Sequence, residues 1–242
     1  MAQEEFHALV VRGEKDSARR EQLAGYIASR SDHRGSLKDF LRARVDAPAS
    51  ASTQAGNAQP SHDVDRFLKT GLDREQARQI FDASGPNTVL SPQKCPPILC
   101  CLLPCLNSTP KMKMYNNNCP ESASVTRSSK RFLIDSTNLV VGDVVTVYEG
   151  DIVAADMRVV EVLKTPLQAD VSVLFTSPSA RRAPMTRNLT DKEDSPGVSL
   201  LDSGRMLFMG TTMTSGAATC IVTATGKASL WSSMIAMNRW PF

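Results

Sequence analysis

The hydrophobic pattern changes its period about halfway along the chain. Before residue 90 the apolar positions recur at helical spacing, and from Phe132 onward they fall in short β-branched runs. Because helices repeat every 3.6 residues and strands every two, this change predicts helices followed by a β-rich body. After Gly226, one helical face is again indicated by Leu230, Trp231, Met234 and Ile235. The expected fold class is mainly β with helical additions.

Residues 1–45 are expected to form two or three short helices that act as a docking arm. Charged residues flank three apolar stripes, which consist of Phe6, Leu9 and Val10, then Leu23, Tyr26 and Ile27, then Leu37, Phe40 and Leu41. Each stripe is too narrow to build a core and needs another surface to pack on. Residues 46–62 lack large apolar side chains and are expected to be a flexible linker.

Residues 63–90 are expected to form a helical cap. Asp73 is a good N-cap, Gln76 stands at its third position, and Gly85-Pro86 supplies the stop. Together they predict a helix of about three turns.

Short apolar runs predict the strands of the β body, with Gly-Asp, Pro and Ser clusters between them. The runs are residues 144–148, 159–163, 170–175, 205–209 and 219–225. The pairs Gly142-Asp143 and Gly150-Asp151 each predict a tight turn closed by a carboxylate that bonds to the backbone.

Two blocks of this body resemble the signatures of the actuator domain of P-type cation-transporting ATPases. One runs from Leu139 to Arg158, with Ala154 where the family normally has Pro, and the other runs from Ser203 to Gly226. The signature residues are Gly142, Asp143, Gly150, Asp151, Asp156, Gly210, Thr211, Gly216 and Gly226. An earlier block, from Gly71 to Asn87, is similar to the cytosolic helix before the first membrane span of these pumps. The resemblance implies an actuator-like distorted jelly roll (double-stranded β-helix) with N-terminal helices.

The resemblance also implies domain boundaries. Residues 91–123 would be a connector in place of the membrane hairpin of the pumps, because they are too few and too polar for two spans. Residues 124–237 would be the actuator-like β domain, and residues 238–242 an apolar tail. The ending Trp240-Pro241-Phe242 can tuck into its own domain or enter a pocket of a partner, and the sequence leaves both open.

The chain departs from the family at the hydrolytic loop. In the pumps a Thr-Gly-Glu-Ser loop positions the water that hydrolyses an aspartyl phosphate. The matching loop here is Thr176, Ser177, Pro178 and Ser179, so Ser177, or Pro178 if one residue is inserted, replaces the Glu. Neither side chain can take a proton from water. Because the chain also lacks the phosphorylated Asp-Lys-Thr-Gly motif and stops before a nucleotide domain, we expect no enzymatic activity.

Cysteines and histidines give no strong metal or cofactor signal, and none of either is expected. The cysteine cluster, formed by Cys95, Cys100, Cys101, Cys105 and Cys119, lacks paired Cys-x-x-Cys knuckles and a nearby His. Three interpretations stay open: a structural zinc, S-palmitoylation of Cys100, Cys101 and Cys105, or plain thiols in a shortened connector. The histidines, His7, His33 and His62, all precede the β body.

Charge and hydropathy exclude some partners. The 242 residues include 28 Lys and Arg against 25 Asp and Glu, a balance that argues against nucleic acid. No run approaches the roughly 20 apolar residues of a membrane span. The segment Met1–Phe6 has no signal- or transit-peptide pattern, so a cytoplasmic location is expected.

Three functions fit these observations. The first is a non-enzymatic structural or interaction protein, a pseudo-actuator that joins a multi-subunit cytoplasmic or cytoskeletal assembly through the arm, with peripheral membrane contact through acylated cysteines. The second is a regulator that acts in trans on an intact P-type cation ATPase. The third is phosphate chemistry by Asp143, Asp151 or Asp156, although these side chains fit turn and capping roles better.

Overall fold

The computed structural model describes residues 66–92, 109–175, 185–192, 194, 201 and 203–240. The docking arm, the linker, Cys100, Cys101, Cys105 and the loop residues Thr176 to Ser179 lie outside this part. The helices are α5 (Arg74–Ser84), α7 (Pro110–Asn117), α8 (Ser172–Phe175) and α9 (Leu230–Ala236). The strands are β1 (Ser122–Arg127), β2 (Lys130–Asp135), β3 (Val144–Tyr148), β4 (Asp156–Asp170), β5 (Thr186–Asn188), β6 (Met206–Leu207) and β7 (Thr212–Ala224).

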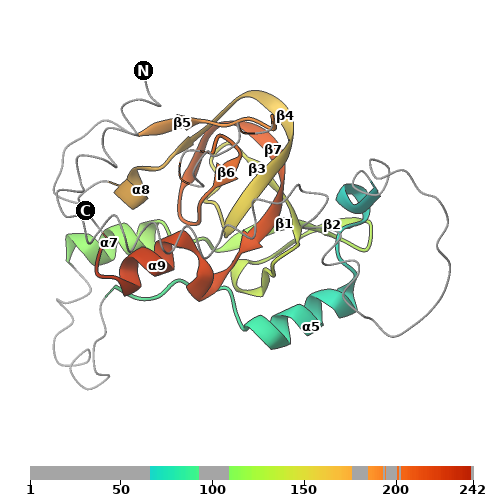
Figure 1. The fold of residues 1–242 in the computed structure, drawn as a ribbon, viewed down its shortest axis with the longest axis horizontal. Helices are drawn as coiled ribbons and strands as arrows, with labels where there is room; N and C mark the ends of the chain where they lie inside the picture. The colour runs from blue at the N-terminus through green and yellow to red at the C-terminus, as the bar shows by residue number, and fades with distance from the viewer. Residues whose placement is uncertain are drawn as a thin grey trace.

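The described strands form one antiparallel sheet in the order β2-β1-β3-β7-β4-β5, and β6 pairs with β4. The long strands β4 and β7 pair along most of their length, with several register shifts. Such bulges bend a ladder and strengthen its twist. In Figure 1 the strands gather into one body, with α7 and α9 along one side and α5 apart from them. The expected β-rich, actuator-like fold class is confirmed.

Two hydrophobic clusters hold the body together. The inner face of the sheet buries side chains of β1, β3, β4 and β7, among them Val125, Val145, Met157 and Cys220. A second cluster lies where α8 and α9 meet and contains Leu174, Trp231 and Trp240, with Tyr115 of α7 packed against it. The tail residue Trp240 is therefore tucked into its own domain, one of the two alternatives that the sequence left open.

The expected α5 is present with both bonds of a capping box. The Asp73 carboxylate accepts from the Gln76 backbone N–H, and the Gln76 side chain accepts from the Asp73 N–H at 3.1 Å; Asp73 also accepts from the Glu75 N–H at 3.4 Å. Gly85 ends the helix with a hydrogen bond from its N–H to the Phe81 carbonyl. Because these bonds join neighbours in the sequence, the pattern alone was enough to place this helix.

One strand prediction is wrong. Residues 170–175 were expected to be extended, but β4 ends at Asp170 and α8 follows. The physical reason is local: the Asp170 carboxylate accepts from the Ser172 backbone N–H at 2.9 Å, and this turn competes with continued strand pairing. The sequence prediction also missed α7, β1, β2 and β5, each of which has eight residues or fewer.

Candidate functional site

The loop that would carry hydrolytic chemistry leaves the sheet after β4 and returns at β5. At this stem Ser172 Oγ donates to Asp170 Oδ1 at 2.5 Å and accepts from the Met185 backbone N–H at 2.7 Å. The Val171 N–H donates to the Met185 carbonyl at 2.9 Å. Ser172 and Val171 thus tie the outgoing chain to the returning chain, and the stem is closed by hydrogen bonds.

Between the two sides of the stem, the sequence offers no group for proton transfer. Residues 176–184 read Thr-Ser-Pro-Ser-Ala-Arg-Arg-Ala-Pro and contain no Asp, Glu or His. A general base for water is most often a carboxylate or an imidazole. Any base that served this loop would therefore have to come from another segment.

Aromatic side chains pack beneath the stem. The Trp240 indole N–H donates to the Val173 carbonyl of α8 at 2.5 Å. The rings of Trp231 and Trp240 lie 5.4 Å apart, and Tyr115 lies 5.4 Å from Trp231. Gly210 runs directly past Trp231, where a Cβ atom would come within 2.6 Å of the indole. The loop base thus rests on side chains from both α7 and α9.

The two signature blocks bond to each other along their length. At one turn the Gly142 N–H donates to the Val222 carbonyl at 2.8 Å, and the Val222 N–H donates to the Asp143 carbonyl at 2.9 Å. At the other, the Gly150 N–H donates to the Met213 carbonyl at 2.8 Å. Beyond the second turn the Val153 N–H donates to the Thr211 carbonyl at 2.8 Å. The signature residues therefore mark where residues 142–156 join residues 210–226.

The carboxylates of the two Gly-Asp turns bond to backbone. Asp143 Oδ2 accepts from the Val140 N–H at 2.9 Å and from Arg127 Nη2 at 2.6 Å, while Arg127 Nε donates to Asp143 Oδ1 at 2.7 Å. Asp151 Oδ2 accepts from the Tyr148 N–H at 2.8 Å. Asp143 is fully buried and held by a two-pronged guanidinium contact, so it is engaged in holding its turn.

Asp156 joins three segments. Its Oδ1 accepts from the Met209 N–H at 3.0 Å, and its Oδ2 accepts from the Leu230 N–H at 2.7 Å, at the first residue of α9. Its backbone carbonyl accepts from Thr223 Oγ1 at 3.0 Å. A carboxylate is stabilised by such backbone donors at a helix N-terminus, and here Asp156 binds the first N–H of α9 while Ser229 serves as the N-cap.

Asn87 fastens the N-terminal helical part to the β body. Its Nδ2 donates to the carbonyls of Ser136 at 2.9 Å and Ala154 at 2.8 Å, and its Oδ1 accepts from the Gly226 N–H at 2.7 Å. These bonds use both amide hydrogens and the oxygen of one buried side chain. The remaining signature glycine, Gly216, lies where β7 crosses β4, and a Cβ there would meet the Pro166 carbonyl oxygen at 2.5 Å.

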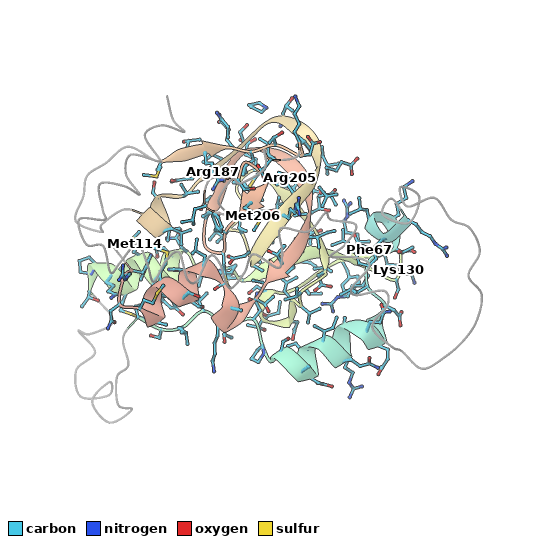
Figure 2. The ribbon with its side chains drawn as sticks, viewed as in Figure 1. Phe67, Met114, Lys130, Arg187, Arg205 and Met206 are labelled. Carbon is cyan, nitrogen blue, oxygen red and sulfur yellow. The ribbon has the colours of Figure 1, made fainter. Side chains whose placement is uncertain are left out.

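Two buried arginines brace the chain beyond β5 (Figure 2). Arg187 Nη2 donates to the Ser203 carbonyl, and its Cζ lies 5.6 Å from the centroid of the Phe208 ring. Arg205 Nε donates to the Val159 carbonyl at 3.4 Å. Sequence reasoning did not single out these arginines, nor Arg127, Asp170 and Ser172. An Asp-x-Ser pattern at the end of an apolar run was the one signal that could have found the stem.

The described residues contain no group of three or more His, Cys, Asp or Glu side chains placed to hold a metal ion. Of the cysteines, Cys119 and Cys220 are in the described part and both are free thiols. Complete burial raises the pKa of the Cys220 thiol far above its usual range, so this side chain behaves as a core residue. Among the helices of the described part, none is both long and apolar enough to cross a membrane.

Comparison with known families agrees with this geometry. The sequence model of the P-type ATPase actuator domain matches residues 117–238, which include every signature residue and the loop stem. The chain belongs to the P-type ATPase actuator-domain family. The expectation drawn from the two signature blocks is thereby confirmed.

Curated relatives of this actuator domain are far longer proteins. Calcium-transporting ATPase 1 of Schizosaccharomyces pombe is 36% identical over 120 residues, which cover 50% of this chain and 12% of the relative. Potassium-transporting ATPase alpha chain 1 of Xenopus laevis is 30% identical over 123 residues, which cover 51% of this chain and 11% of the relative. The matched segments thus span only 12% of the length of the first relative and 11% of the second.

Among solved structures, a crystal structure of a zinc-transporting PIB-type ATPase in the E2.Pi state matches with a TM-score of 0.37 and 21% identity. The match covers 52% of this chain and 17% of the other.

Proposed function

We propose that this chain is a non-enzymatic pseudo-actuator, a structural or interaction protein that keeps the shape of the actuator domain without its hydrolytic group. The observation that carries the proposal is the contrast between the stem and the loop. Asp170, Ser172 and Met185 form a fully bonded stem, yet residues 176–184 hold no carboxylate or imidazole. The hydrogen bonds that hold the two ends of the loop are present, but the loop has no side chain that could take a proton from water.

The carboxylates of the β body do not replace that group. Asp143 and Asp156 are buried; the first accepts from one backbone N–H and from Arg127, the second accepts from two backbone N–H groups, and Asp151 closes a turn. A carboxylate that acts as a base must instead reach a water or a substrate atom. This argument favours the turn-and-cap role over the enzymatic alternative.

An acyl-phosphate assay tests the absence of hydrolysis. The full chain is incubated with acetyl phosphate, and release of inorganic phosphate is compared with buffer. We expect equal rates, because a positioned general base is what contributes about 10²- to 10⁴-fold. Hydrolysis above buffer that is abolished by Asp143→Asn, Asp151→Asn or Asp156→Asn would contradict the proposal.

The interaction role is proposed to use the arm. Its third stripe, which includes Leu37 and Phe40, offers apolar side chains to a neighbour in a cytoplasmic or cytoskeletal assembly. Membrane contact through acylation of Cys100, Cys101 or Cys105 belongs to the same proposal and is tested by hydroxylamine-sensitive labelling of the native protein.

Sedimentation of the tagged full chain from native cells tests the assembly. We expect the wild-type chain in a complex much larger than its own mass, and the double variant Leu37→Glu, Phe40→Glu at monomer size. The matched control Ala47→Glu, Ala49→Glu adds the same charge in residues 46–62 and should leave the complex intact. A wild-type monomer would exclude the assembly.

A second candidate is regulation of an intact P-type cation ATPase in trans. It is favoured by the 36% identity to a calcium-transporting ATPase, since similar surfaces can compete for the same contacts. The test adds the purified chain to a calcium-transporting ATPase reconstituted in vesicles. Unchanged ATPase activity and no co-sedimentation at micromolar chain would remove this candidate.

A further inference from the structure

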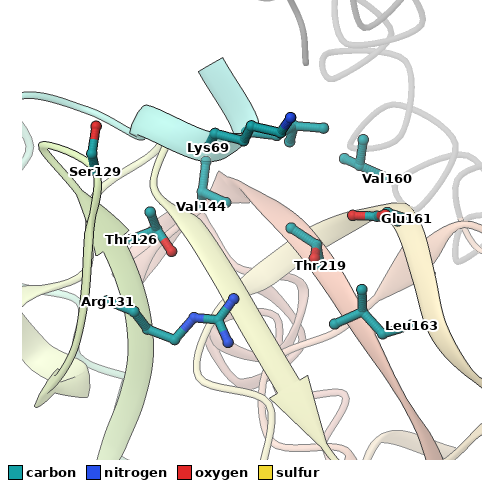
Figure 3. A pocket seen from close by; sticks show the side chains of 10 residues that line it. Lys69, Thr126, Ser129, Arg131, Val144, Val160, Glu161, Leu163 and Thr219 are labelled. Atoms are coloured by element: carbon teal, nitrogen blue, oxygen red, sulfur yellow. The ribbon is translucent and has the colours of Figure 1, made fainter. Parts of the chain in front are cut away.

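The outer face of the sheet carries an open groove of about 870 Å³. Figure 3 shows its walls: the helical turn of residues 66–70 carries Lys69, and Arg131 extends from β2 across the groove. Apolar side chains in the lining are Leu68, Val144, Val160 and Leu163. Hydroxyl groups come from Thr126, Ser129 and Thr219.

This face of the sheet is only partly covered. Phe67 and Leu68 pack on Val144 and Ile221 and close one end of the face. Beyond them Leu163 is 46% exposed and Tyr148 is 43% exposed. Val145 and Val147 point to the inner core, so Tyr148 lies on the outer face by strand alternation. Tyr148 and Leu163 thus leave apolar surface on this face open to contact with another segment.

The groove has two cations against one acid. Lys69 makes no ion pair with a carboxylate of the described residues, and Arg131 Nη1 donates to the Tyr148 hydroxyl at 3.1 Å. Glu161 is the single acidic side chain of the lining. An occupant with apolar side chains and a local negative charge would complement these walls.

We propose that residues 4–11 of this same chain dock in the groove as an amphipathic helical segment. Phe6, Leu9 and Val10 recur at helical spacing and would lie on the apolar floor, while Glu5 borders that face and would lie beside Lys69 and Arg131, and Glu4 precedes it at the end of the segment. The proposal does not depend on the proposed function, since the assembly is assigned to a different stripe.

Charge selects this stripe among the three of the arm. Within three residues of the first stripe stand Glu4 and Glu5 against Arg12, a net negative charge. The same window holds Arg20 and Arg30 against Glu21 at the second stripe, and Arg34, Lys38, Arg42 and Arg44 against Asp39 at the third, so both are net positive. Cations next to the apolar side chains would meet Lys69 and Arg131 with like charge, which disfavours both stripes.

The covalent connection makes the contact feasible. The chain enters the described part at Arg66, in the helical turn that forms one wall of the groove. Residues 12–65 join the segment to that wall, and an extended chain spans up to about 3.3–3.6 Å per residue. Tethering gives an effective concentration of the order of millimolar, so even a weak contact would be populated.

A zero-length carbodiimide cross-link tests the docking in the full chain. The reagent joins a carboxylate to an amine in direct contact, and the monomer band is digested and analysed by mass spectrometry. We expect a link between Lys69 and Glu4 or Glu5. Leu163→Glu should lower its yield about tenfold, because it removes apolar area and adds a like charge beside the glutamates. Lys113→Glu on α7 is the matched control and should leave the yield unchanged.

Exchanging the charges of the two segments distinguishes a loss of docking from a mere loss of the amine or carboxylate that the reagent needs. Lys69→Glu alone should abolish the link, and adding Glu4→Lys with Glu5→Lys should restore a link between the same two segments. Leu163→Glu must keep the wild-type melting temperature, since Leu163 is exposed. A link of equal yield to Lys113, a link insensitive to Leu163→Glu, or a link found only in dimers would overturn the proposal.

Discussion

The indole N–H of Trp240 donates a hydrogen bond to the backbone carbonyl of Val173. These residues are 67 positions apart, and the bond joins the segment after α9 to the helix at the base of the loop stem. Both are buried in the same cluster. The C-terminal segment of the described part therefore supports the loop base directly.

Replacing Trp240 should weaken the domain. Trp240→Phe removes the donor and leaves a buried carbonyl unpaired, at an expected cost of about 2 kcal/mol. Trp240→Ala also opens a cavity and should cost about 3–5 kcal/mol. Urea unfolding of the full chain measures both, with Ala236→Ser on the exposed part of α9 as the control. Equal midpoints for Trp240→Phe and the wild type would show that the bond contributes nothing.

Asp156→Asn should destabilise far more than Asp151→Asn. The Asp156 carboxylate accepts two buried backbone N–H groups, and an amide would turn a donor toward one of them. The expected cost is about 2–4 kcal/mol, against about 1 kcal/mol or less for the exposed Asp151, which accepts one. Hydrogen exchange should show faster exchange of the Leu230 amide in the Asp156 variant. A protected Leu230 amide would refute the capping role of Asp156.

Gly216→Ala and Gly150→Ala form a matched pair. Both glycines have positive φ, +87° and +92°, so each alanine is expected to cost about 1–2 kcal/mol in backbone strain. A Cβ at position 216 would also meet the Lys164 carbonyl oxygen at 2.6 Å, whereas position 150 has open space. The melting temperature of Gly216→Ala should therefore be well below that of Gly150→Ala. Equal melting temperatures would contradict the close approach of β4 and β7.

The α5 cap should weaken in acid. A hydrogen bond from Ser128 and bonds from the backbone N–H groups of Arg74 and Glu75 lower the pKa of Asp73 below its usual 3.8. A depressed carboxyl pKa stabilises the fold above the unfolded-state value, and this contribution is lost as the pH falls through the folded-state value. The melting-temperature difference between wild type and Asp73→Asn should thus shrink below about pH 4. Ser128→Ala should make that difference smaller at neutral pH, and a difference independent of pH would exclude the cap as its source.

Features formed by residues close together in the sequence could be predicted from it. The capping box of Asp73 and Gln76 joins near neighbours, and the residues that build it are sufficient to recognise it. The strand at residues 144–148 was equally clear, since it is a short run of mostly β-branched residues next to a Gly-Asp turn. The two signature blocks identified the family because their turn residues stand in a fixed order.

Contacts between residues far apart in the chain could not be predicted from the sequence. Arg127 and Asp143 are 16 residues apart, and Asn87 and Gly226 are 139 apart, so no periodicity links them. At residues 170–175 the β-branched Val171 and Val173 favoured a strand, but the Asp170 side chain turns the chain first. The groove depends on five separate segments of the fold, and only their three-dimensional arrangement brings Lys69 and Arg131 into the same lining.

The hydrogen bonds of Asn87 have a practical consequence for anyone who expresses this domain. The family match begins at residue 117, so a fragment trimmed to that boundary would lose the Asn87 side chain. The carbonyls of Ser136 and Ala154 and the N–H of Gly226 would then lose a shared partner in the interior. Each unpaired buried group costs about 1–3 kcal/mol, a large part of the stability of a small domain. A fragment that starts upstream of Asn87 is therefore expected to be more stable than one that starts at residue 117.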